Sequence, residues 1–408
     1  MANKKNKLRL TVAFICTLAM VQTANAQDCK TNEELDAQPG KYLTAAQYPW
    51  PAVRAEYFSN LTSATDKAMA KNTLERLEKI EQQSHAGFNL TGGNWENYYA
   101  TDGYGYFNNF KLGKYSFQSS LHEYFCNKGK LMRNDEANTI LRIYVNTIPL
   151  NTLQRFLRNP FGSSMGDYDF GLQYIDWKNH APADVNAQLI ALFTYMTCNS
   201  EPLIEAINGG NKYFQDVPDK EIRPNNRNNY VYRYWFINKN NLPVLVPVSR
   251  KEYLQSLLEY YEREKLHFPK LVAKLTKDHD NGVKQYIHWE ADVTDKIAVV
   301  KKAISEHNEE WLSAQAVINR LEDASQTYKA KLTERTNYNR FWKFYDKENK
   351  SEPLYRYNPA YFKPDAVSPA RPQMMTIAFR YVSIPSSTRI LNNFTNNFDF
   401  KDVRQLVQ

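Results

Sequence analysis

Residues 230–264, YVYRYWFINKNNLPVLVPVSRKEYLQSLLEYYERE, carry the strongest structural signals in the chain. Val231 to Ile237 is almost unbroken aromatic and β-branched sequence, which predicts a strand that is covered on both faces. The Asn-rich residues 238–241 tolerate left-handed backbone and predict a turn. Leu242 to Val248 is extended again, and its two prolines remove backbone donors, which predicts an edge strand. Ser249 then opens an S-x-x-E capping box, so a helix is expected to follow this two-stranded hairpin.

Two long helices are expected in the next part of the chain. From Ile297 to Leu332, mostly apolar residues recur in alternating steps of three and four over about five heptads, which is typical of a coiled coil. A second apolar stripe runs from Leu254 to Leu275, and Asp278 to Gly282 supplies the residues of a turn. Each stripe needs a partner, so we expect an antiparallel helical hairpin.

The remaining elements are expected from shorter patterns. A charged stretch with helical periodicity covers Thr62 to Gln82, and a second helix is expected over Ala183 to Thr197. Even spacing of apolar residues favours a strand over Tyr115 to Phe125, with a helix over Leu121 to Cys126 as the alternative for its end. The β-branched run Thr139 to Val145 predicts a buried strand next to it. Met374 to Ser383 is again typical of a strand.

Together these patterns predict an α+β fold. We expect residues 1–26 to be a signal peptide and residues 27–248 to form an α+β domain that contains antiparallel strands. Residues 249–345 are expected to form the long helical hairpin. Residues 346–408 are expected to be a short extended C-terminal segment that packs on the core.

The beginning of the chain has the pattern of a secretory signal peptide. Four basic residues precede an apolar run from Leu10 to Val21, and Ala24-Asn25-Ala26 matches a cleavage site. We therefore expect a periplasmic or extracellular protein. No later apolar run is long enough for a transmembrane helix. The chain has 52 Lys and Arg against 44 Asp and Glu, and four of the basic residues lie in the leader, so no nucleic-acid partner is expected.

Three cysteines follow the leader: Cys29, Cys126 and Cys198. In an oxidising compartment they predict one disulfide and one remaining thiol. Because Cys29 lies just after the cleavage site, we expect Cys126 and Cys198 to pair. The two pairings through Cys29 remain open.

Candidate ligand-binding residues lie on the first strand, where Arg233 alternates with Tyr232, Tyr234 and Trp235. The chain is 14% aromatic and has 28 Tyr, which suits either a Tyr-rich core or a surface that stacks on sugars. In an exported protein, rings beside a guanidinium group suit a glycan or an anionic cell-wall polymer. Such a site requires Arg233 and Trp235 to reach solvent together, since they share a strand face. The alternative, which we expect for Trp235, is that the strand belongs to the core.

Three short motifs are weak chemical signals. Gly162-Ser163-Ser164-Met165-Gly166 fits G-x-S-x-G, but Asn159-Pro160 would break the strand that a nucleophile elbow needs. His122 and Cys126 echo half of a zinc motif without its second His. Asp278 to Gly282 resembles the start of a calcium loop, but the ligand spacing is wrong. We therefore expect no metal and no cofactor.

A resemblance adds to the expectation of export. Asn238 to Leu254 and Asn358 to Phe362 resemble stretches in uncharacterised secreted proteins of gram-negative bacteria, a resemblance that implies export and carries no assigned activity. The expected function is a non-enzymatic binding or envelope-associated protein with a glycan or cell-wall polymer as ligand. The alternative is a secreted hydrolase of such polymers that uses carboxylates near Asp167 and Asp169. Whether the chain is an enzyme, and its oligomeric state, stay open.

Overall fold

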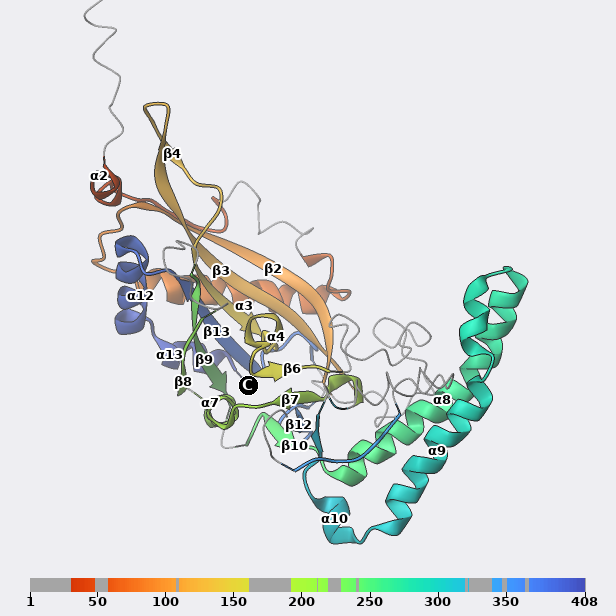
Figure 1. The fold of residues 1–408 in the computed structure, drawn as a ribbon. Coiled ribbons are helices and arrows are strands. Elements are labelled where there is room, and N and C mark those ends of the chain that lie inside the picture. Colours follow the sequence, from red (N-terminus) through yellow and green to blue (C-terminus); the bar gives the residue numbers. More distant parts are fainter. Residues whose placement is uncertain are drawn as a thin grey trace, which may run out of the picture.

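The computed structural model describes residues 31–47, 58–107, 110–160, 192–210, 212–218, 229–239, 242–319, 322, 340–346, 351–363 and 367–407. A large mixed sheet with the strand order β1-β2-β3-β5-β13-β9-β8 forms its centre, and β4 pairs with β3 beyond this path (Figure 1). Its strands are β1 (Tyr42–Leu43), β2 (Gly93–Phe107), β3 (Phe110–Asn127), β4 (Lys130–Arg133), β5 (Thr139–Val145), β8 (Lys212–Pro218), β9 (Val231–Asn238) and β13 (Met374–Tyr381).

A smaller antiparallel sheet lies against one side of the large sheet, in the order β10-β12-β7-β6 with β11 paired to β12. Its strands are β6 (Leu157–Arg158), β7 (Met196–Cys198), β10 (Leu245–Pro247), β11 (Val317–Ile318) and β12 (Glu352–Tyr357). The helices are α2 (Asn32–Asp36), α3 (Ala64–Gln83), α4 (Leu150–Leu153), α7 (Glu201–Gly209), α8 (Arg250–Lys277), the 3₁₀ helix η3 (Asn281–Tyr286), α9 (Trp289–Glu306), α10 (Glu309–Ser313), α12 (Pro385–Asn397) and α13 (Phe400–Leu406).

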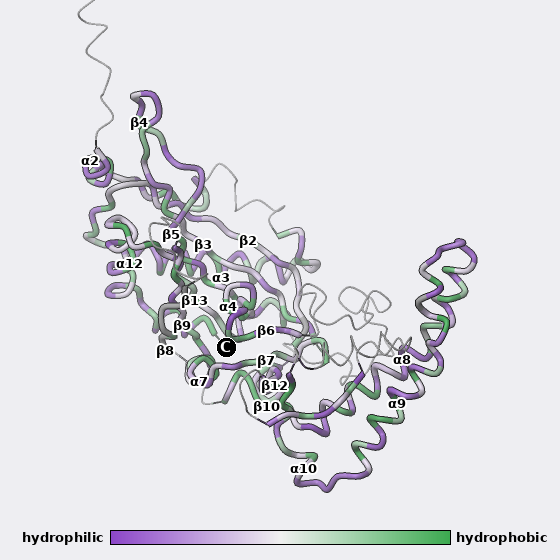
Figure 2. Tube along the Cα trace, viewed as in Figure 1, coloured by the Kyte–Doolittle hydropathy of each residue, from purple (hydrophilic) through white to green (hydrophobic). Residues whose placement is uncertain are grey.

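The two faces of the large sheet are buried against different partners. One face packs on α3, α12 and α13 through a core that contains Leu74, Phe117, Ile377 and Phe394. The other face packs on α7 and the small sheet, with Tyr234 inside that second core. Figure 2 shows hydrophobic positions mixed with hydrophilic ones along the strands and helices of these layers. A strand that is covered on both faces was the expectation for β9, and it is confirmed.

A third core lies between α8, α9 and α10 and reaches the small sheet through Ile318 of β11 and Leu354 of β12. Ser249 caps α8 by accepting a hydrogen bond from the Glu252 amide at 3.1 Å, as the capping box predicts. Lys296 of α9 and Glu264 of α8 form a buried ion pair at 3.1 Å. The two helices extend away from the body of the molecule (Figure 1), and we call residues 250–306 the α8–α9 arm.

The prediction of three successive parts along the chain is wrong. These parts were a domain with antiparallel strands, a long helical hairpin and an extended tail. Helices occur at separate places along the chain, and strands of the two sheets come from most of it, between Tyr42 and Tyr381. The expected five-heptad seam from Ile297 to Leu332 is interrupted, because α9 ends at Glu306 and Asn308 caps the short α10. The chain then returns to the small sheet as β11. Periodicity identified apolar positions but not the end of the helix.

The C-terminal segment is also different from its prediction. β13 lies in the middle of the large sheet, where it pairs antiparallel with both β5 and β9. α12 and α13 follow it and cover the sheet, so the segment packs on the core as expected but is not extended. The reason is burial: Met375, Ile377 and Phe379 are completely buried, so this run needs neighbours on both edges and both faces.

Two further local predictions fail. β9 and the Leu245–Pro247 strand do not form a hairpin, because β9 belongs to the large sheet and β10 pairs with β12 in the small one. The helix expected over Ala183 to Thr197 falls largely outside the described residues, and its end is wrong because Met196–Cys198 is strand β7. The strands expected over Tyr115 to Phe125 and Thr139 to Val145 are confirmed and are neighbours.

Candidate functional site

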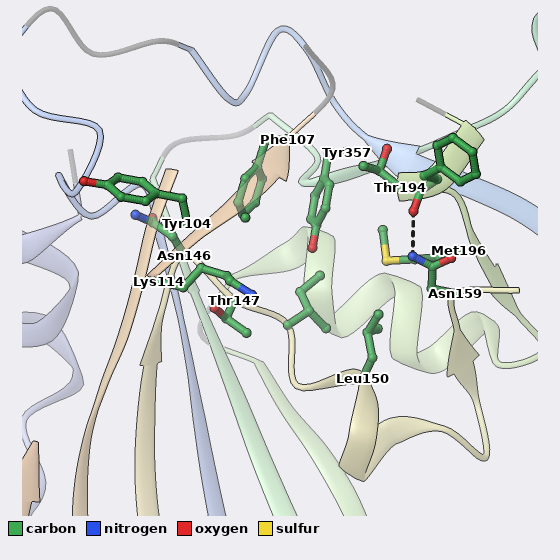
Figure 3. Close-up of a pocket in the computed structure, with 13 residues that line it drawn as sticks. Tyr104, Phe107, Lys114, Asn146, Thr147, Leu150, Asn159, Thr194, Met196 and Tyr357 are labelled. Carbon is green, nitrogen blue, oxygen red and sulfur yellow. Dashed lines mark hydrogen bonds between the residues drawn. The ribbon is translucent and has the colours of Figure 1, made fainter. Parts of the chain in front are cut away.

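A cavity of about 360 Å³ opens where the large sheet meets the small one (Figure 3). Its walls come from the far ends of β2 and β3, from the connection between β5 and α4, and from β7 and β12. Residues from distant parts of the chain therefore meet in it. This volume lies at the lower end of the range of small-molecule pockets, which is roughly 300–1,000 Å³.

One wall of the cavity is aromatic. The ring centroids of Phe107 and Tyr357 are 4.5 Å apart, and Phe362 lies behind both, at 4.7 Å from Phe107. Phe107 is almost fully buried and is therefore fixed in place. Such a wall offers an apolar surface against which a flat or ring-shaped ligand can pack.

Two polar groups of the cavity have no hydrogen-bond or ion-pair partner among the residues that the structure describes. They are the ammonium group of Lys114 and the hydroxyl group of Tyr357, and Figure 3 draws both side chains lining the cavity. Burial raises the pKa of Tyr357, so its hydroxyl remains a neutral hydrogen-bond donor at ordinary pH. Together they can donate hydrogen bonds to a ligand, and Lys114 also supplies a positive charge.

Gly105 decides how Lys114 lies. A Cβ atom built on Gly105 would come within 2.7 Å of Cδ and 3.0 Å of Cε of Lys114. The aliphatic chain of the lysine therefore lies across the bare backbone of β2. A side chain at position 105 would displace it.

Tyr104 is held at the edge of the cavity by a buried carboxylate. Its hydroxyl donates a hydrogen bond to Asp66 Oδ2 at 2.6 Å, and Ser368 donates to Asp66 Oδ1 at 2.5 Å. Burial alone would raise the pKa of Asp66, but the hydrogen bonds from Ser368, Tyr104 and Ser63 outweigh it and lower that pKa. Asp66 therefore stays ionised and orients Tyr104.

Asn146 lines the cavity, and its side-chain hydrogen bonds are already made within the protein. Its side-chain amide donates to the carbonyl groups of Gly113 and Arg371, both at 3.0 Å, and its Oδ1 accepts from the Gln373 amide at 2.8 Å. Its φ of 52° is one that Asn tolerates. Asn146 is thus a structural residue that joins the end of β5 to the start of β13.

None of the described residues that line the cavity is an Asp, Glu, His or Cys. Lys114 and the tyrosine hydroxyls are its ionisable groups, and the rest of the lining is aromatic, aliphatic, amide or hydroxyl. This lining offers a polar ligand hydrogen-bond donors, one positive charge and an aromatic wall.

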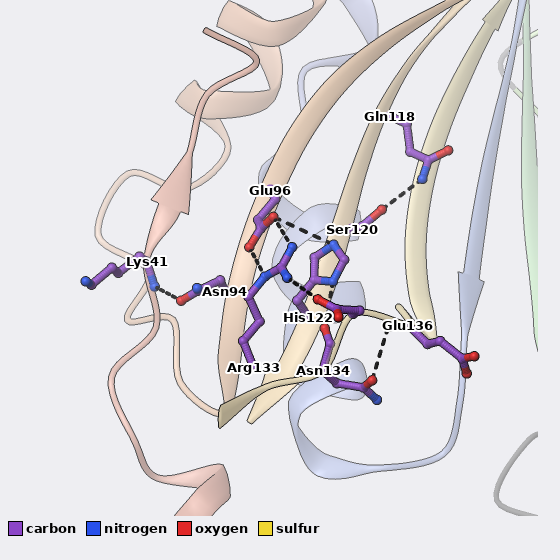
Figure 4. Close-up of polar contacts among 10 residues, drawn as sticks. Lys41, Asn94, Glu96, Gln118, Ser120, His122, Arg133, Asn134 and Glu136 are labelled. Atoms are coloured by element: carbon purple, nitrogen blue, oxygen red, sulfur yellow. Dashed lines mark hydrogen bonds and ion pairs between the residues drawn. The ribbon is translucent and has the colours of Figure 1, made fainter. Parts of the chain in front are cut away.

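A second polar cluster lies near the opposite end of β2 and β3 (Figure 4). Glu96 is almost fully buried and accepts two hydrogen bonds from Arg133, Nε at 2.5 Å and Nη2 at 2.7 Å. His122 Nε2 lies 3.8 Å from the same carboxylate, and its Nδ1 is 2.9 Å from the Asn134 carbonyl oxygen. Because every charge is matched, this cluster fastens β4 onto the sheet.

A third polar cluster lies under the other face of the sheet. Glu81 is almost fully buried, accepts a hydrogen bond from Trp95 Nε1 at 2.6 Å and contacts the ring of His85. Tyr42 packs on that ring with centroids 4.5 Å apart. These contacts hold α3 against β2 and satisfy the carboxylate.

The predicted ligand-binding residues do not form an exposed platform. The Trp235 side chain is only 7% exposed and packs against Phe394 and Phe400, with ring centroids 5.5 Å away in both cases. Tyr234 is completely buried on the opposite face of β9. Arg233 is half-buried, with its guanidinium 5.9 Å from the ring of Tyr381. Trp235 is therefore a core residue, as expected, and cannot stack on a glycan.

Tyr232 is half-buried beside Tyr234, with ring centroids 5.9 Å apart. Asp167 and Asp169, like the G-x-S-x-G motif, lie outside the described residues. The signal-peptide prediction also falls outside them.

The metal-like motifs do not assemble into sites within the described ranges, where no group of three His, Cys, Asp or Glu side chains surrounds a common point. His122 and Cys126 lie on strand β3, where four residues span about 13 Å, too far for a shared zinc ion. Asp280 caps the following turn by accepting from the Gly282 amide at 2.8 Å.

The structure also corrects the predicted pairing of Cys126 with Cys198. Cys198 is a buried free thiol in β7. Cys126 lies in an exposed position near the end of β3. Of the pairings that the sequence leaves open, Cys29 with Cys126 is the one that does not use Cys198.

Comparison of the chain with protein-family models, with curated proteins and with solved structures gives no match. None of the helices in the described ranges is both long enough and apolar enough to cross a membrane.

The sequence patterns do not distinguish the cavity residues from their neighbours. Tyr104, Gly105 and Phe107 lie in a stretch that reads as loop or short strand, and Lys114 is one of many lysines. The resemblance at Asn358 to Phe362 lies next to Tyr357 but does not identify it as a ligand-binding residue.

Proposed function

We propose that this protein binds a small polar ligand that carries an anionic group, such as an acidic sugar or a carboxylate-bearing fragment of a cell-wall polymer, without converting it. The observation that carries the proposal is the pair of Lys114 and Tyr357. Both line one cavity, and neither the Lys114 ammonium group nor the Tyr357 hydroxyl group has a polar partner within the described part of the chain.

The chemistry of the cavity matches such a ligand. The ammonium group of Lys114 pairs with a carboxylate, and the Tyr357 hydroxyl donates to a ligand oxygen. The rings of Phe107 and Tyr357 pack against the apolar face of a sugar ring. A hydrogen bond to a charged group contributes about 1.5–3 kcal/mol, so the acidic group is expected to dominate selectivity.

The cellular setting of the proposal comes from the sequence. The basic, apolar and A-x-A pattern of residues 1–26 supports export, and glycans and cell-wall fragments are ligands that an exported protein meets. We accordingly propose a periplasmic or extracellular location.

Isothermal titration calorimetry of the mature chain tests this proposal. We expect glucuronate and N-acetylmuramate to bind at least about tenfold more tightly than glucose and N-acetylglucosamine, because only the acids pair with Lys114. Lys114→Met should abolish the preference. Lys111→Met is the matched control on the same strand and should retain it. Equal binding of acidic and neutral sugars, or full affinity in Lys114→Met, would contradict the proposal.

An activity assay on the same purified protein tests the hydrolase alternative. Purified chain is incubated with peptidoglycan and with neutral polysaccharides, and reducing ends are measured over time. We expect no increase above a heat-denatured control. Product formation that Asp167→Asn or Asp169→Asn abolishes would overturn the non-enzymatic assignment.

A further inference from the structure

The face of β3 that lines the cavity continues along the strand beyond it. Lys114, Ser116 and Gln118 follow one another in steps of two, so their side chains lie on one face of the sheet. The register places Ser116 opposite Tyr144 of β5, and Gln118 opposite Arg142 of β5. Four residues of strand span about 13 Å, so Arg142 is attached to the sheet about that far along from Lys114.

The guanidinium group of Arg142 contacts neutral groups and has no carboxylate partner among the residues that the structure describes. Its Nε and Nη2 both donate to Gln118 Oε1, and Nη2 also donates to the Tyr98 hydroxyl at 2.9 Å. The Gln118 amide is oriented for this role, because its Nε2 donates to Ser120 Oγ at 2.8 Å (Figure 4). These contacts hold the guanidinium group in place and leave its positive charge unmatched.

A second arginine adds positive charge to the same face. The register between β5 and β13 places Arg380 diagonally next to Arg142. Its Nη2 donates to the Ala137 carbonyl, and its guanidinium lies 4.5 Å from the centroid of the Tyr230 ring. Its Nε is buried without a hydrogen-bond partner. In the described part of the chain, Arg380 therefore has no carboxylate partner either.

A carboxylate on the same face does not cancel these charges. Glu96 lies in the strand row of Arg380, with Ser120 and Ile140 between them. Its carboxylate is already paired with Arg133 through two hydrogen bonds. The charge of Glu96 is therefore matched locally, and the arginines of the face keep their excess positive charge.

Tyr144 stands between the cation of the cavity and that of Arg142. It occupies the row of Ser116, which lies between the rows of Lys114 and Gln118. The Arg142 guanidinium is 5.6 Å from the centroid of its ring. Tyr144 and Arg142 are half-buried, whereas Ser116 and Gln118 beneath them are buried. The outer layer of this face therefore presents a cation, an aromatic ring and a second cation in succession, starting at the cavity.

We propose that the ligand is an oligomer of acidic sugars, which binds Lys114 through one acidic group, Arg142 through a second, and Tyr144 through a sugar ring. This inference rests on the proposed function, because the first acidic sugar lies in the cavity. Four of the five N–H donors of Arg142 are used within the protein, which leaves one Nη1 donor and the charge for a carboxylate. An acidic polysaccharide repeats a ring and a carboxylate along its length and so matches this succession.

Isothermal titration calorimetry of the full mature chain with galacturonate and with trigalacturonate tests the inference. We expect trigalacturonate to bind at least about tenfold more tightly, because a second hydrogen bond to a charged group contributes that factor or more. Arg142→Met should bind both ligands with similar affinity and should keep the native affinity for galacturonate. Lys114→Met should bind both ligands more weakly than the native chain does.

Arg233→Met is the matched control, because Arg233 is a half-buried arginine on the opposite face of the same sheet. It should keep the native preference for trigalacturonate. Circular dichroism checks that the variants are folded. A second readout uses the native chain alone: methyl-esterified trigalacturonate should have no advantage over methyl-esterified galacturonate, since neither ester pairs with Arg142.

The outcomes separate this inference from the proposed function. Native binding of galacturonate without a gain for trigalacturonate overturns the inference and leaves the proposed function standing. Retention of the gain in Arg142→Met, or with the methyl esters, also overturns it. Absence of binding by both acids contradicts the proposed function and the inference together.

Discussion

Gly105 lies directly beneath the side chain of Lys114, close enough that a Cβ atom would stand 2.7 Å from Cδ of the lysine. The two residues belong to the paired strands β2 and β3, in which Gly103 is opposite Lys114 and Leu112 is opposite Gly105. The contact is therefore diagonal across the strand pair. It makes a glycine on one strand responsible for the position of the cationic group on the other.

Gly105→Ala should weaken binding of an acidic sugar without unfolding the protein. The new methyl group displaces the flexible Lys114 chain, so we expect a loss of about 0.5–1.5 kcal/mol, less than the full value of the charged hydrogen bond. Calorimetry with glucuronate measures it. In a Lys114→Met background the same substitution should have no further effect, and an additive loss would contradict the geometric coupling.

Trp235→Ala should destabilise the fold. Trp235 packs on Phe394 and Phe400, so truncation leaves a cavity in the core and costs about 3–5 kcal/mol. A thermal or urea melt measures the loss. Leu242→Ala is the control, because Leu242 is 45% exposed and should change stability little. An unchanged melt in Trp235→Ala would show that the ring is not structural.

Lys296→Met should destabilise the α8–α9 arm more than a double replacement does. Lys296 and Glu264 are both 4% exposed and pair at 3.1 Å, so removing the lysine leaves a buried carboxylate without its partner charge. Breaking such a pair costs about 3–5 kcal/mol, whereas an apolar pair is often neutral. Urea melts followed by circular dichroism compare Lys296→Met with Lys296→Met/Glu264→Leu. Equal losses would mean that the ion pair does not couple the helices.

The Cys198 thiol should be unreactive in the folded protein. Burial raises the pKa of this thiol to about 11, so little thiolate exists at pH 8. We expect iodoacetamide to label Cys198 readily only after denaturation. Because the folded pKa is the higher one, the stability of the fold is unaffected by this thiol below its unfolded pKa of about 8.5 and falls as pH rises from there toward 11, where only the unfolded state ionises.

Peptide mapping of the non-reduced chain tests whether Cys29 pairs with Cys126. With Cys198 free and buried, we expect a peptide that joins Cys29 to Cys126. A bridge that contains Cys198 would contradict the structure.

Asp66→Asn should make stability less sensitive to acid. The pKa of Asp66 is lowered in the folded protein, so its stabilising effect is present above the unfolded pKa of about 3.9 and is lost as pH falls through the lower folded pKa. The variant should be less stable than the native chain at pH 7, and the difference should shrink in acid. Urea midpoints measured between pH 7 and pH 3 check this, and a constant difference across that range would contradict it.

Several elements follow from the sequence because their signals are local. The β-branched run Thr139 to Val145 is β5 with the same bounds, and the predicted helix over Thr62 to Gln82 is α3 within two residues at each end. Ser249 caps α8 as its S-x-x-E pattern predicts. Capping and β-branched runs act between residues close in the chain, so neighbours alone are enough to identify them.

The partners of these elements were decided by tertiary structure. The run from Met374 to Ser383 reads as a strand, yet its place between β5 and β9 depends on pairing with residues far away in the chain. The apolar seam from Ile297 to Leu332 reads as one helix, yet α9 stops at Glu306 and β11 joins the small sheet. Periodicity reports which residues are buried and not what buries them.

The candidate site shows most clearly the difference between what the sequence determines and what the tertiary structure decides. Export, the α+β class and the core role of Trp235 are expectations that the sequence supports by itself. No local sequence pattern marks Lys114 or Tyr357 as a ligand-binding residue. Only the packing of one sheet on the other brings them to a common cavity. A ligand site of this kind depends on contacts between segments more than half of the chain apart, and such contacts leave no pattern in either segment.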